Sequence, residues 1–316
     1  MRVLVTGGNG FVGRHLCSAL RARGFDLVAG VHDPDGVADP ARGEVSLELR
    51  DSDGLRESIG RVRPDLVFHL AAEAFVPAAN RDPMRAFDIN ALGTARLLEA
   101  IRNSRRDSFP RVIYASSAEV YGIRERSELP LRETLAAHPA TPYAASKLSG
   151  EAIALAWRAT YGIPAIVARA FNHIGPGQDE RFAVASFAHG LAAVAGGASS
   201  VLTVGNLSAE RDFLDVRDVV AAYIALAERG QDGQVYNVCS GRPVAMQEIL
   251  RQLIAIAHVP VEVRQDPARL RPSDLPISFG DNAKLRDATG WSPQYPLSRS
   301  LADVYADARE RLALAG

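Results

Sequence analysis

Residues 2–13 read RVLVTGGNGFVG, and this stretch decides the fold. The apolar run 2–6 is typical of a strand, and an amphipathic helix is expected over 11–23. Glycines at 7, 10 and 13 permit a tight turn, close approach of the backbone to a pyrophosphate, and close packing of helix on strand. Because a helix N-terminus attracts phosphates, the stretch predicts a dinucleotide site. A glycine-rich turn without a ligand is the alternative.

Apolar runs alternate with helical patterns through the first 170 residues. This rhythm predicts an α/β fold, namely a Rossmann-type doubly wound parallel sheet. The runs 66–68 and 112–114 are continuously apolar, as strands buried on both faces are. The predicted strands are 2–6, 26–31, 45–49, 65–70, 111–116 and 165–170, and the predicted helices are 11–23, 52–61, 83–104 and 142–161.

The sequence changes in character after Asn172, which predicts a smaller C-terminal α/β lobe. Segment 172–182 reads as a loop, and the proline-rich stretch 266–280 as an irregular one. We expect a dinucleotide-binding domain over 1–171, to which 209–238 returns, and a second domain mainly over 172–316. The predicted elements of the second half are helices 216–229, 245–257 and 297–313, and strands 234–238 and 261–264.

Composition excludes several classes of protein. The 316 residues carry a net charge of −1 without a basic block, so nucleic acid is not an expected partner. No apolar stretch is long enough to span a membrane. Cys17 and Cys239 lie in apolar contexts without metal-ligand spacing, so we expect no metal site and a reducing cytoplasm. The N-terminus runs straight into a strand, which predicts no signal peptide.

The end of the second strand bears on the cofactor. An acid there would bind the ribose hydroxyls and exclude a 2′-phosphate, but Val31 holds that position. His32 then either faces a 2′-phosphate or is exposed, and Glu48 either reaches the adenine amine or is solvated. We therefore predict NADPH or NADH as cofactor. The predicted contacts are Gly7, Gly10, Phe11, Val12, Gly13, His32, Glu48, Leu49, Leu70, Ala71, Ala72, Tyr143 and Lys147.

Tyr143 and Lys147 form the most informative pair. The chain has only two lysines, Lys147 and Lys284, and four-residue spacing on a helix puts Tyr143 and Lys147 on one face. A nearby ammonium favours the phenolate, so we expect Tyr143 to exchange a proton close to neutral pH. Ser117, after the strand 111–116, either donates to a substrate carbonyl or caps a turn. Glu119 either acts as an acid or base or caps the loop.

Four motifs carry a family resemblance: TGGNGFVG at 6–13, HLAAE at 69–73, SSAEVYG at 116–122 and YAASK at 143–147. Together they resemble the extended short-chain dehydrogenase/reductases over the whole chain. The resemblance implies a Rossmann domain, a smaller substrate domain and a nucleotide-sugar substrate. It also implies that Ser117, Tyr143 and Lys147 form a catalytic triad, with Tyr143 as proton donor or acceptor and Lys147 also holding the nicotinamide ribose.

Three further motifs resemble the GDP-mannose branch of that family, and within it the reductases: NHIGPGQ at 172–178, RDFLDVRD at 211–218 and RPSDLP at 271–276. The implied reaction reduces the C4 ketone of GDP-4-keto-6-deoxy-D-mannose to GDP-D-rhamnose. Arginine forks suit diphosphate oxygens, although solvated or ion-paired arginines are the alternative. This branch usually has an arginine where His32 stands. The implied substrate contacts are Asn172, Arg211, Arg271 and Asp274.

Alternatives remain open at this point. A nucleotide-sugar epimerase would use the same triad and recycle its NAD, and a 4,6-dehydratase would use Glu119 to remove a proton beside the ketone. A non-catalytic NAD(P)-sensing module would keep the fold but would not need the triad. The family resemblance also implies a homodimer that pairs through helices 83–104 and 142–161, which offer apolar positions at Ala91, Ala95, Leu98, Ile153 and Ala156. A monomer whose second lobe covers those positions is the alternative.

Overall fold

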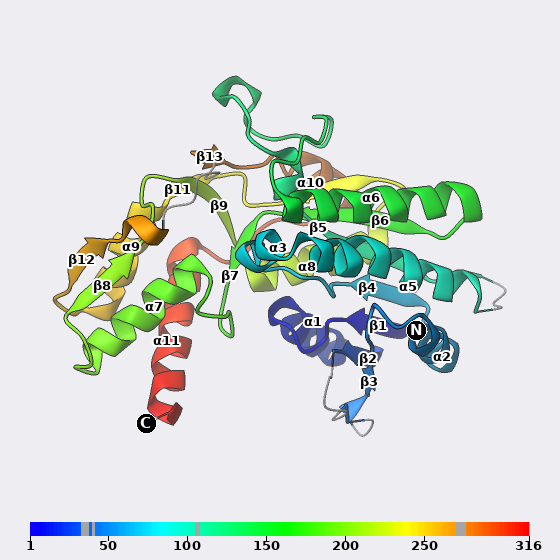
Figure 1. The fold of residues 1–316 in the computed structure, drawn as a ribbon, viewed down its shortest axis with the longest axis horizontal. Helices are drawn as coiled ribbons and strands as arrows, with labels where there is room; N and C mark the ends of the chain where they lie inside the picture. The colour runs from blue at the N-terminus through cyan, green and yellow to red at the C-terminus, as the bar shows by residue number, and fades with distance from the viewer. Residues whose placement is uncertain (33–37, 40–41, 105–107, 270–275, 316) are drawn as a thin grey trace.

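A seven-stranded parallel sheet forms the larger lobe, and a smaller lobe lies beside the carboxyl ends of its strands (Figure 1). The computed structural model describes residues 1–316 apart from 33–37, 40–41, 105–107, 270–275 and 316. The strand order β10-β6-β5-β4-β1-β2-β3 confirms the predicted Rossmann-type α/β fold. Its strands are β1 (Arg2–Thr6), β2 (Asp26–Val31), β3 (Glu44–Ser46), β4 (Leu66–His69), β5 (Arg111–Ser117), β6 (Ala165–Ala170) and β10 (Val235–Val238).

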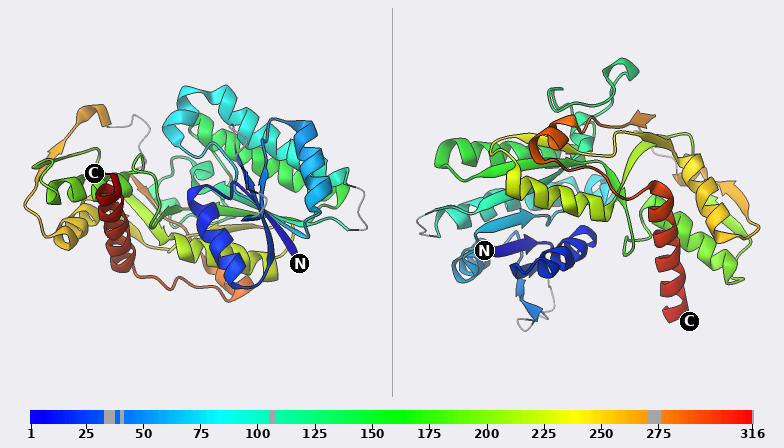
Figure 2. Two further views of the ribbon diagram at one scale, coloured as in Figure 1. Left: turned by 90° about the horizontal axis from the view of Figure 1, so that it is seen from below. Right: turned by 180° about the vertical axis from the view of Figure 1, so that it is seen from behind.

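Helices cover both faces of this sheet, as the left-hand view of Figure 2 shows. Val67 and Phe68 are adjacent in β4 and fully buried in clusters on opposite faces. The continuously apolar run therefore reflects a strand covered on both sides. The helices of this lobe are α1 (Phe11–Ala22), α2 (Ser52–Val62), α3 (Val76–Arg81), α4 (Pro83–Phe87), the π-helix η2 (Asp88–Leu92), α5 (Gly93–Arg102), η3 (Ala118–Tyr121), η4 (Arg126–Glu128), α6 (Pro142–Tyr161), α8 (Val216–Arg229) and α10 (Ala283–Thr289).

The smaller lobe has its own core beneath three helices, which lie to the left in Figure 1. Strand β9 is its centre and pairs with β7, β11 and β13, while β8 and β12 form a separate parallel pair. The strands are β7 (Asn172–Ile174), β8 (Val201–Val204), β9 (Glu210–Asp215), β11 (Pro243–Ala245), β12 (Glu262–Gln265) and β13 (Ile277–Ser278); the helices are α7 (Ala183–Ala195), α9 (Met246–Ala257), η5 (Pro267–Arg269) and α11 (Leu297–Ala315).

Several predicted boundaries differ from the structure. The strand predicted over 45–49 is shorter because β3 lies at the sheet edge and pairs only with β2. The helix predicted over 83–104 is interrupted by the π-helix η2. Segment 172–182, predicted as a loop, begins with β7, which β9 stabilises by pairing. Within 209–238, β9 pairs with strands of the smaller sheet, whereas β10 pairs with β6 in the larger one.

Among the described helices, none has the length together with the apolar composition that a transmembrane span needs.

Candidate active site

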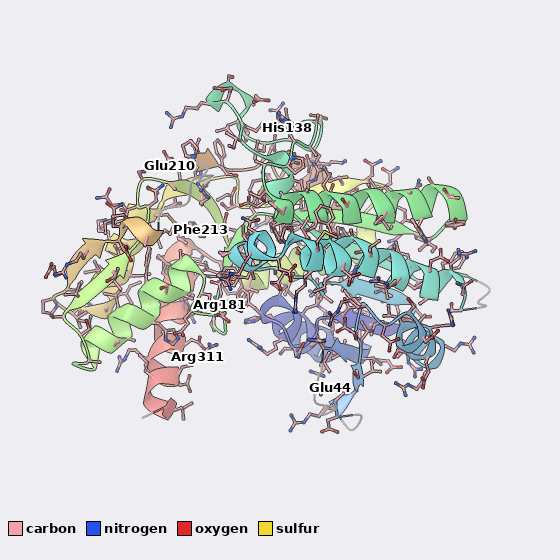
Figure 3. The ribbon with its side chains drawn as sticks, in the orientation of Figure 1. Glu44, His138, Arg181, Glu210, Phe213 and Arg311 are labelled. Carbon is pink, nitrogen blue, oxygen red and sulfur yellow. The ribbon has the colours of Figure 1, made fainter. Side chains whose placement is uncertain are left out.

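A cavity of about 1340 Å³ lies between the two lobes, at the carboxyl ends of the parallel strands. Ligands of open α/β sheets bind at this edge. Both lobes contribute to its wall, and Figure 3 shows Arg181 and Phe213 where the lobes meet. The predicted residues on this wall are Gly7, Gly10, Phe11, Val12, Gly13, His32, Glu48, Leu49, Leu70, Ala71, Ala72, Ser117, Glu119, Tyr143, Asn172 and Arg211.

The glycine-rich loop closes tightly between β1 and α1. Gly7 has a φ of +69°, which disfavours any side chain there. A Cβ on Gly13 would lie 2.1 Å from the carbonyl oxygen of Gly7. Thr6 links this loop to β4, because its Oγ1 accepts from the Ala71 amide at 3.1 Å. Backbone therefore forms the floor of the cavity where α1 begins, which suits a pyrophosphate.

Three ionisable side chains line the far end of the same half of the cavity. His32 Nδ1 lies 3.3 Å from Glu48 Oε2, and Arg50 Nη2 lies 3.1 Å from the same oxygen. Hydrogen bonding from Arg50 lowers the pKa of Glu48, although burial opposes this. Glu48 is thus ion-paired within the protein rather than simply solvated. Arg50 was not among the predicted cofactor residues, although it follows Glu48 closely in the sequence.

Tyr143 stands at the start of α6, with 8% of its surface exposed. Thr141 caps this helix, since its Oγ1 accepts from the Ala144 amide at 3.1 Å. Pro142 suits the first helical position because it has no amide hydrogen to leave unpaired. The first turn of α6 is therefore held firmly, and it presents the phenol to the cavity beside Ser117 and Glu119.

Lys147 lies one turn further along α6 and is 5% exposed. Its Nζ donates to the carbonyl of Ala115 at 2.5 Å and lies 4.7 Å from the centre of the Tyr114 ring. Burial lowers the pKa of Lys147 to about 8, and the carboxylate of Glu151 opposes this shift. Glu151 is itself buried and paired with Arg169 at 2.7 Å.

The sequence predicted that Lys147 would lower the pKa of Tyr143, and this prediction is wrong. Burial raises the pKa of Tyr143 to about 12, a hydrogen bond with Ser117 lowers it, and the carboxylates of Glu119 and Glu73 raise it. The physical reason is that desolvation disfavours the phenolate, while the Lys147 ammonium donates to a carbonyl of β5 instead. Tyr143 is thus a protonated phenol at neutral pH.

Ser117 combines the two roles that the sequence left open. Its Oγ accepts from the Glu119 amide at 3.2 Å and so caps η3. The same hydroxyl bonds to Tyr143 and lines the cavity. A serine hydroxyl can accept and donate at once, so capping η3 does not prevent Ser117 from bonding to Tyr143 or donating to a ligand.

Asn90 is a buried residue behind the cavity wall that positions Glu73 and the first turn of α6, and sequence reasoning missed it. It lies in η2, where its Oδ1 accepts from the Glu73 amide at 2.8 Å. Its Nδ2 donates to Ser146 Oγ at 2.9 Å, and Ser146 donates to the Tyr143 carbonyl at 2.8 Å. Asn90 thereby ties the end of β4 to the first turn of α6. Asn90 lies in a π-helix, and a π-helical turn inside a helix often marks a functional site. Such a turn has no simple sequence pattern, so the sequence alone could not reveal it.

The predicted substrate residues are only partly described. Asn172 is exposed to the cavity, and Arg211 is half-buried there, with Nη1 donating to the Glu210 carbonyl at 2.9 Å. Arg271 and Asp274 lie outside the described residues. The cavity also carries charged side chains that were not predicted as substrate contacts, among them Glu73, Arg85, Arg181 and Arg311.

The three aspartates of the motif 211–218 act mainly as structural anchors. Asp212 accepts from the amides of Ser240 at 2.7 Å and Gly241 at 2.9 Å. Asp215 caps α8, and Asp218 accepts from the Gln294 amide at 2.9 Å. The bonds of Asp212 and Asp218 join β9 and α8 to segments that are distant in the sequence.

Comparison with known proteins agrees with this geometry. The family described as GDP-mannose 4,6 dehydratase matches residues 4–304. The chain is 40% identical over 314 residues to GDP-6-deoxy-D-mannose reductase of Pseudomonas aeruginosa, with 98% of each protein covered.

Two solved structures are similar over nearly their full length. RMD from Pseudomonas aeruginosa, complexed with NADPH, has a TM-score of 0.87 at 39% identity, with 98% of this chain and 99% of that chain covered. UDP-glucose 4-epimerase of Thermus thermophilus, complexed with NAD, has a TM-score of 0.87 at 30% identity, with the same coverage. The predicted family resemblance is therefore confirmed.

Proposed function

This chain belongs to the GDP-mannose 4,6 dehydratase family of extended short-chain dehydrogenase/reductases, and from that premise we propose that it reduces the C4 ketone of GDP-4-keto-6-deoxy-D-mannose to GDP-D-rhamnose. NADPH or NADH is the electron donor. The observation that carries the proposal is that Ser117 and Tyr143 share one cavity with the glycine-rich loop. The reductase relative, 40% identical over 98% of the chain, supports the choice of substrate.

The cavity residues fit a dinucleotide. The backbone cradle around Gly7 and Gly13 has no room for side chains, and it places bare amides at the N-terminus of α1. Leu70, Ala71 and Ala72 supply small apolar contacts beyond β4. We assign the cofactor to 1–171 together with α8 and β10, and the nucleotide sugar mainly to the rest of 172–316.

Each residue of the triad then has a separate role in the reduction. The reduced nicotinamide supplies hydride to the carbonyl carbon. Tyr143 gives its phenolic proton to the sugar oxygen, which is far more basic than a phenolate once it becomes an alkoxide. Ser117 donates a hydrogen bond to the same oxygen and stabilises the developing charge. Lys147 uses one N–H on Ala115 and has two further donors for the ribose hydroxyls.

The test is a turnover assay on a panel of 4-keto-6-deoxy nucleotide sugars with NADPH or NADH. We expect one cofactor consumed per ketone reduced, with the GDP sugar preferred and a rhamnose configuration in the product by NMR. The same assay decides between the two cofactors. An epimerase would turn over without net cofactor loss, and that result would contradict the proposal.

A 4,6-dehydratase is the second candidate, because Glu119 lines the cavity near Tyr143 and the matching family carries that name. Such an enzyme would convert GDP-mannose itself and release water. Solvent deuterium would then enter the sugar ring at C5. We expect neither water release from GDP-mannose nor deuterium at C5.

Reduction is expected to lose activity above about pH 8. Burial lowers the pKa of Lys147 to about 8, so its ammonium is present below that pH and lost above it. Without the charge, Lys147 binds the ribose less well. The measurement is the pH profile of kcat/KM, with Lys284→Arg as the matched control, because Lys284 is the only other lysine. A flat profile to pH 9, or a limb that disappears in Lys284→Arg, would exclude this role.

We propose a homodimer that pairs through α5 and α6, which lie side by side on one outer face (Figure 1). Of the apolar positions predicted for that interface, Ala91 and Leu98 are buried within the protomer itself. Ala156 is exposed and Ala95 and Ile153 are half-buried, so they remain available, as does Leu92 at 52% exposure. Light scattering should give twice the chain mass, and a monomer mass would refute the pairing.

We also propose a cytoplasmic location, because Cys17 and Cys239 are buried free thiols, as a reducing compartment allows. Fractionation should recover the protein with cytosolic markers.

A further inference from the structure

Glu73 places a second carboxylate at the catalytic end of the cavity. It follows β4 and lines the same wall as Ser117, Glu119 and Tyr143. Its side chain is only 20% exposed, and its charge is one of those that raise the pKa of Tyr143. The proposed reaction leaves this carboxylate without a role.

The protein satisfies the Glu73 carboxylate poorly. Within the described part of the chain, Oε1 accepts from the Phe75 amide at 3.4 Å, and Oε2 forms only a long ion pair with Arg85 Nε at 3.8 Å, beyond hydrogen-bond distance. Arg181 also interacts electrostatically with this carboxylate. A carboxylate offers about four acceptor positions, and a largely buried one is costly unless those positions are filled. Donors from a bound molecule would fill them.

The position of Glu73 is nevertheless fixed relative to Tyr143. The Asn90 side chain bonds to both backbone groups of Glu73. It accepts from the Glu73 amide at 2.8 Å and donates to the Glu73 carbonyl at 3.2 Å. The same Asn90 amide group bonds to Ser146, which bonds to the Tyr143 carbonyl. A ligand oriented by Glu73 is therefore oriented relative to the phenol.

We propose that Glu73 accepts a hydrogen bond from the sugar hydroxyl next to the reacting carbon, and so binds, orients and selects the substrate. This inference rests on the proposed function. Of the two carbons beside C4 in a 4-keto-6-deoxyhexose, only C3 bears a hydroxyl, since C5 bears the ring oxygen and the methyl group. A carboxylate would repel the diphosphate, whereas it accepts readily from an O–H group.

The test compares wild type, Glu73→Ala and Glu73→Gln on GDP-4-keto-6-deoxy-D-mannose and on its 3-deoxy analogue. Wild type should lose about tenfold to hundredfold in kcat/KM on the analogue. Glu73→Ala should lose a similar factor on the normal substrate, mainly through KM, and should treat the two sugars within about threefold. Glu73→Gln retains an acceptor and should recover much of the loss. The exposed Glu57 of α2 supplies the control Glu57→Ala, which should match wild type.

Each outcome is decisive. If Glu73→Ala still discriminates against the 3-deoxy sugar as strongly as wild type, the inference fails while the proposed function stands. If the Kd of NADPH rises instead of the KM of the sugar, Glu73 serves the cofactor, and the inference fails again. If wild type reduces no 4-keto sugar, both the inference and the proposed function fail.

Discussion

Replacing Tyr143 by phenylalanine is expected to lower kcat for ketone reduction about 1000-fold. The phenol is protonated at neutral pH, because burial raises its pKa to about 12, and it lines the cavity together with Ser117. Phenylalanine keeps the ring that fills this buried position and removes only the hydroxyl group, and with it the proton donor. Single-turnover rates with saturating NADPH measure the effect directly.

The binding of both ligands should survive this change. The dinucleotide is assigned to the glycine-rich loop and Lys147, so the Kd of NADPH should move less than about threefold. Tyr121→Phe is the matched control, since Tyr121 belongs to the neighbouring motif and its hydroxyl donates to Asn237 at 2.7 Å in the interior. It should cost about 1–3 kcal/mol of stability and leave kcat nearly unchanged. Retention of a tenth of wild-type kcat by Tyr143→Phe would remove the phenol from the mechanism.

The larger lobe was predictable because its strands carry a local signature. Runs such as 66–68 are apolar at every position, since helices cover both faces, and short turns separate them from amphipathic helices. The glycine-rich loop was predictable for a similar reason. The requirement at Gly7 and Gly13 is steric and local, so it appears directly in the residue type.

The smaller lobe was less predictable because its strands depend on distant partners. β7, β11 and β13 have two or three residues each and pair with β9, which is far from each of them in sequence. α7 reads AVASFAHGLAAVA, and with so few polar residues it shows little of the polar face that marks an amphipathic helix.

The hydrogen bonds and pKa shifts of the site residues were even harder to predict than strand pairing. The four-residue spacing correctly places Tyr143 and Lys147 one turn apart on α6. Spacing does not reveal that the Lys147 ammonium donates to Ala115, nor that two carboxylates face the phenol. The direction of the Tyr143 pKa shift depends on these contacts and on burial, and both are properties of the folded chain.

Replacing Ser117 by alanine is expected to slow reduction about 100-fold, which corresponds to about 3 kcal/mol of transition-state stabilisation. The structure gives this serine two separable roles, because its oxygen caps η3 through the Glu119 amide while the same hydroxyl bonds to Tyr143 and lines the cavity, where we expect it to donate to the substrate. Loss of the cap alone would lower stability by about 1 kcal/mol and leave kcat intact. Loss of the donor would lower kcat and leave the Kd values of NADPH and the GDP sugar intact.

Thermal unfolding and turnover of Ser117→Ala therefore separate the cap from the catalytic donor. Ser117→Thr keeps a hydroxyl at the same place and should restore both quantities in large part. Near-wild-type turnover in Ser117→Ala, with a lower melting temperature, would reduce Ser117 to a capping residue. Tyr143 would then be the only protein hydroxyl assigned to the sugar oxygen, and the loss in Tyr143→Phe should be correspondingly greater than 1000-fold.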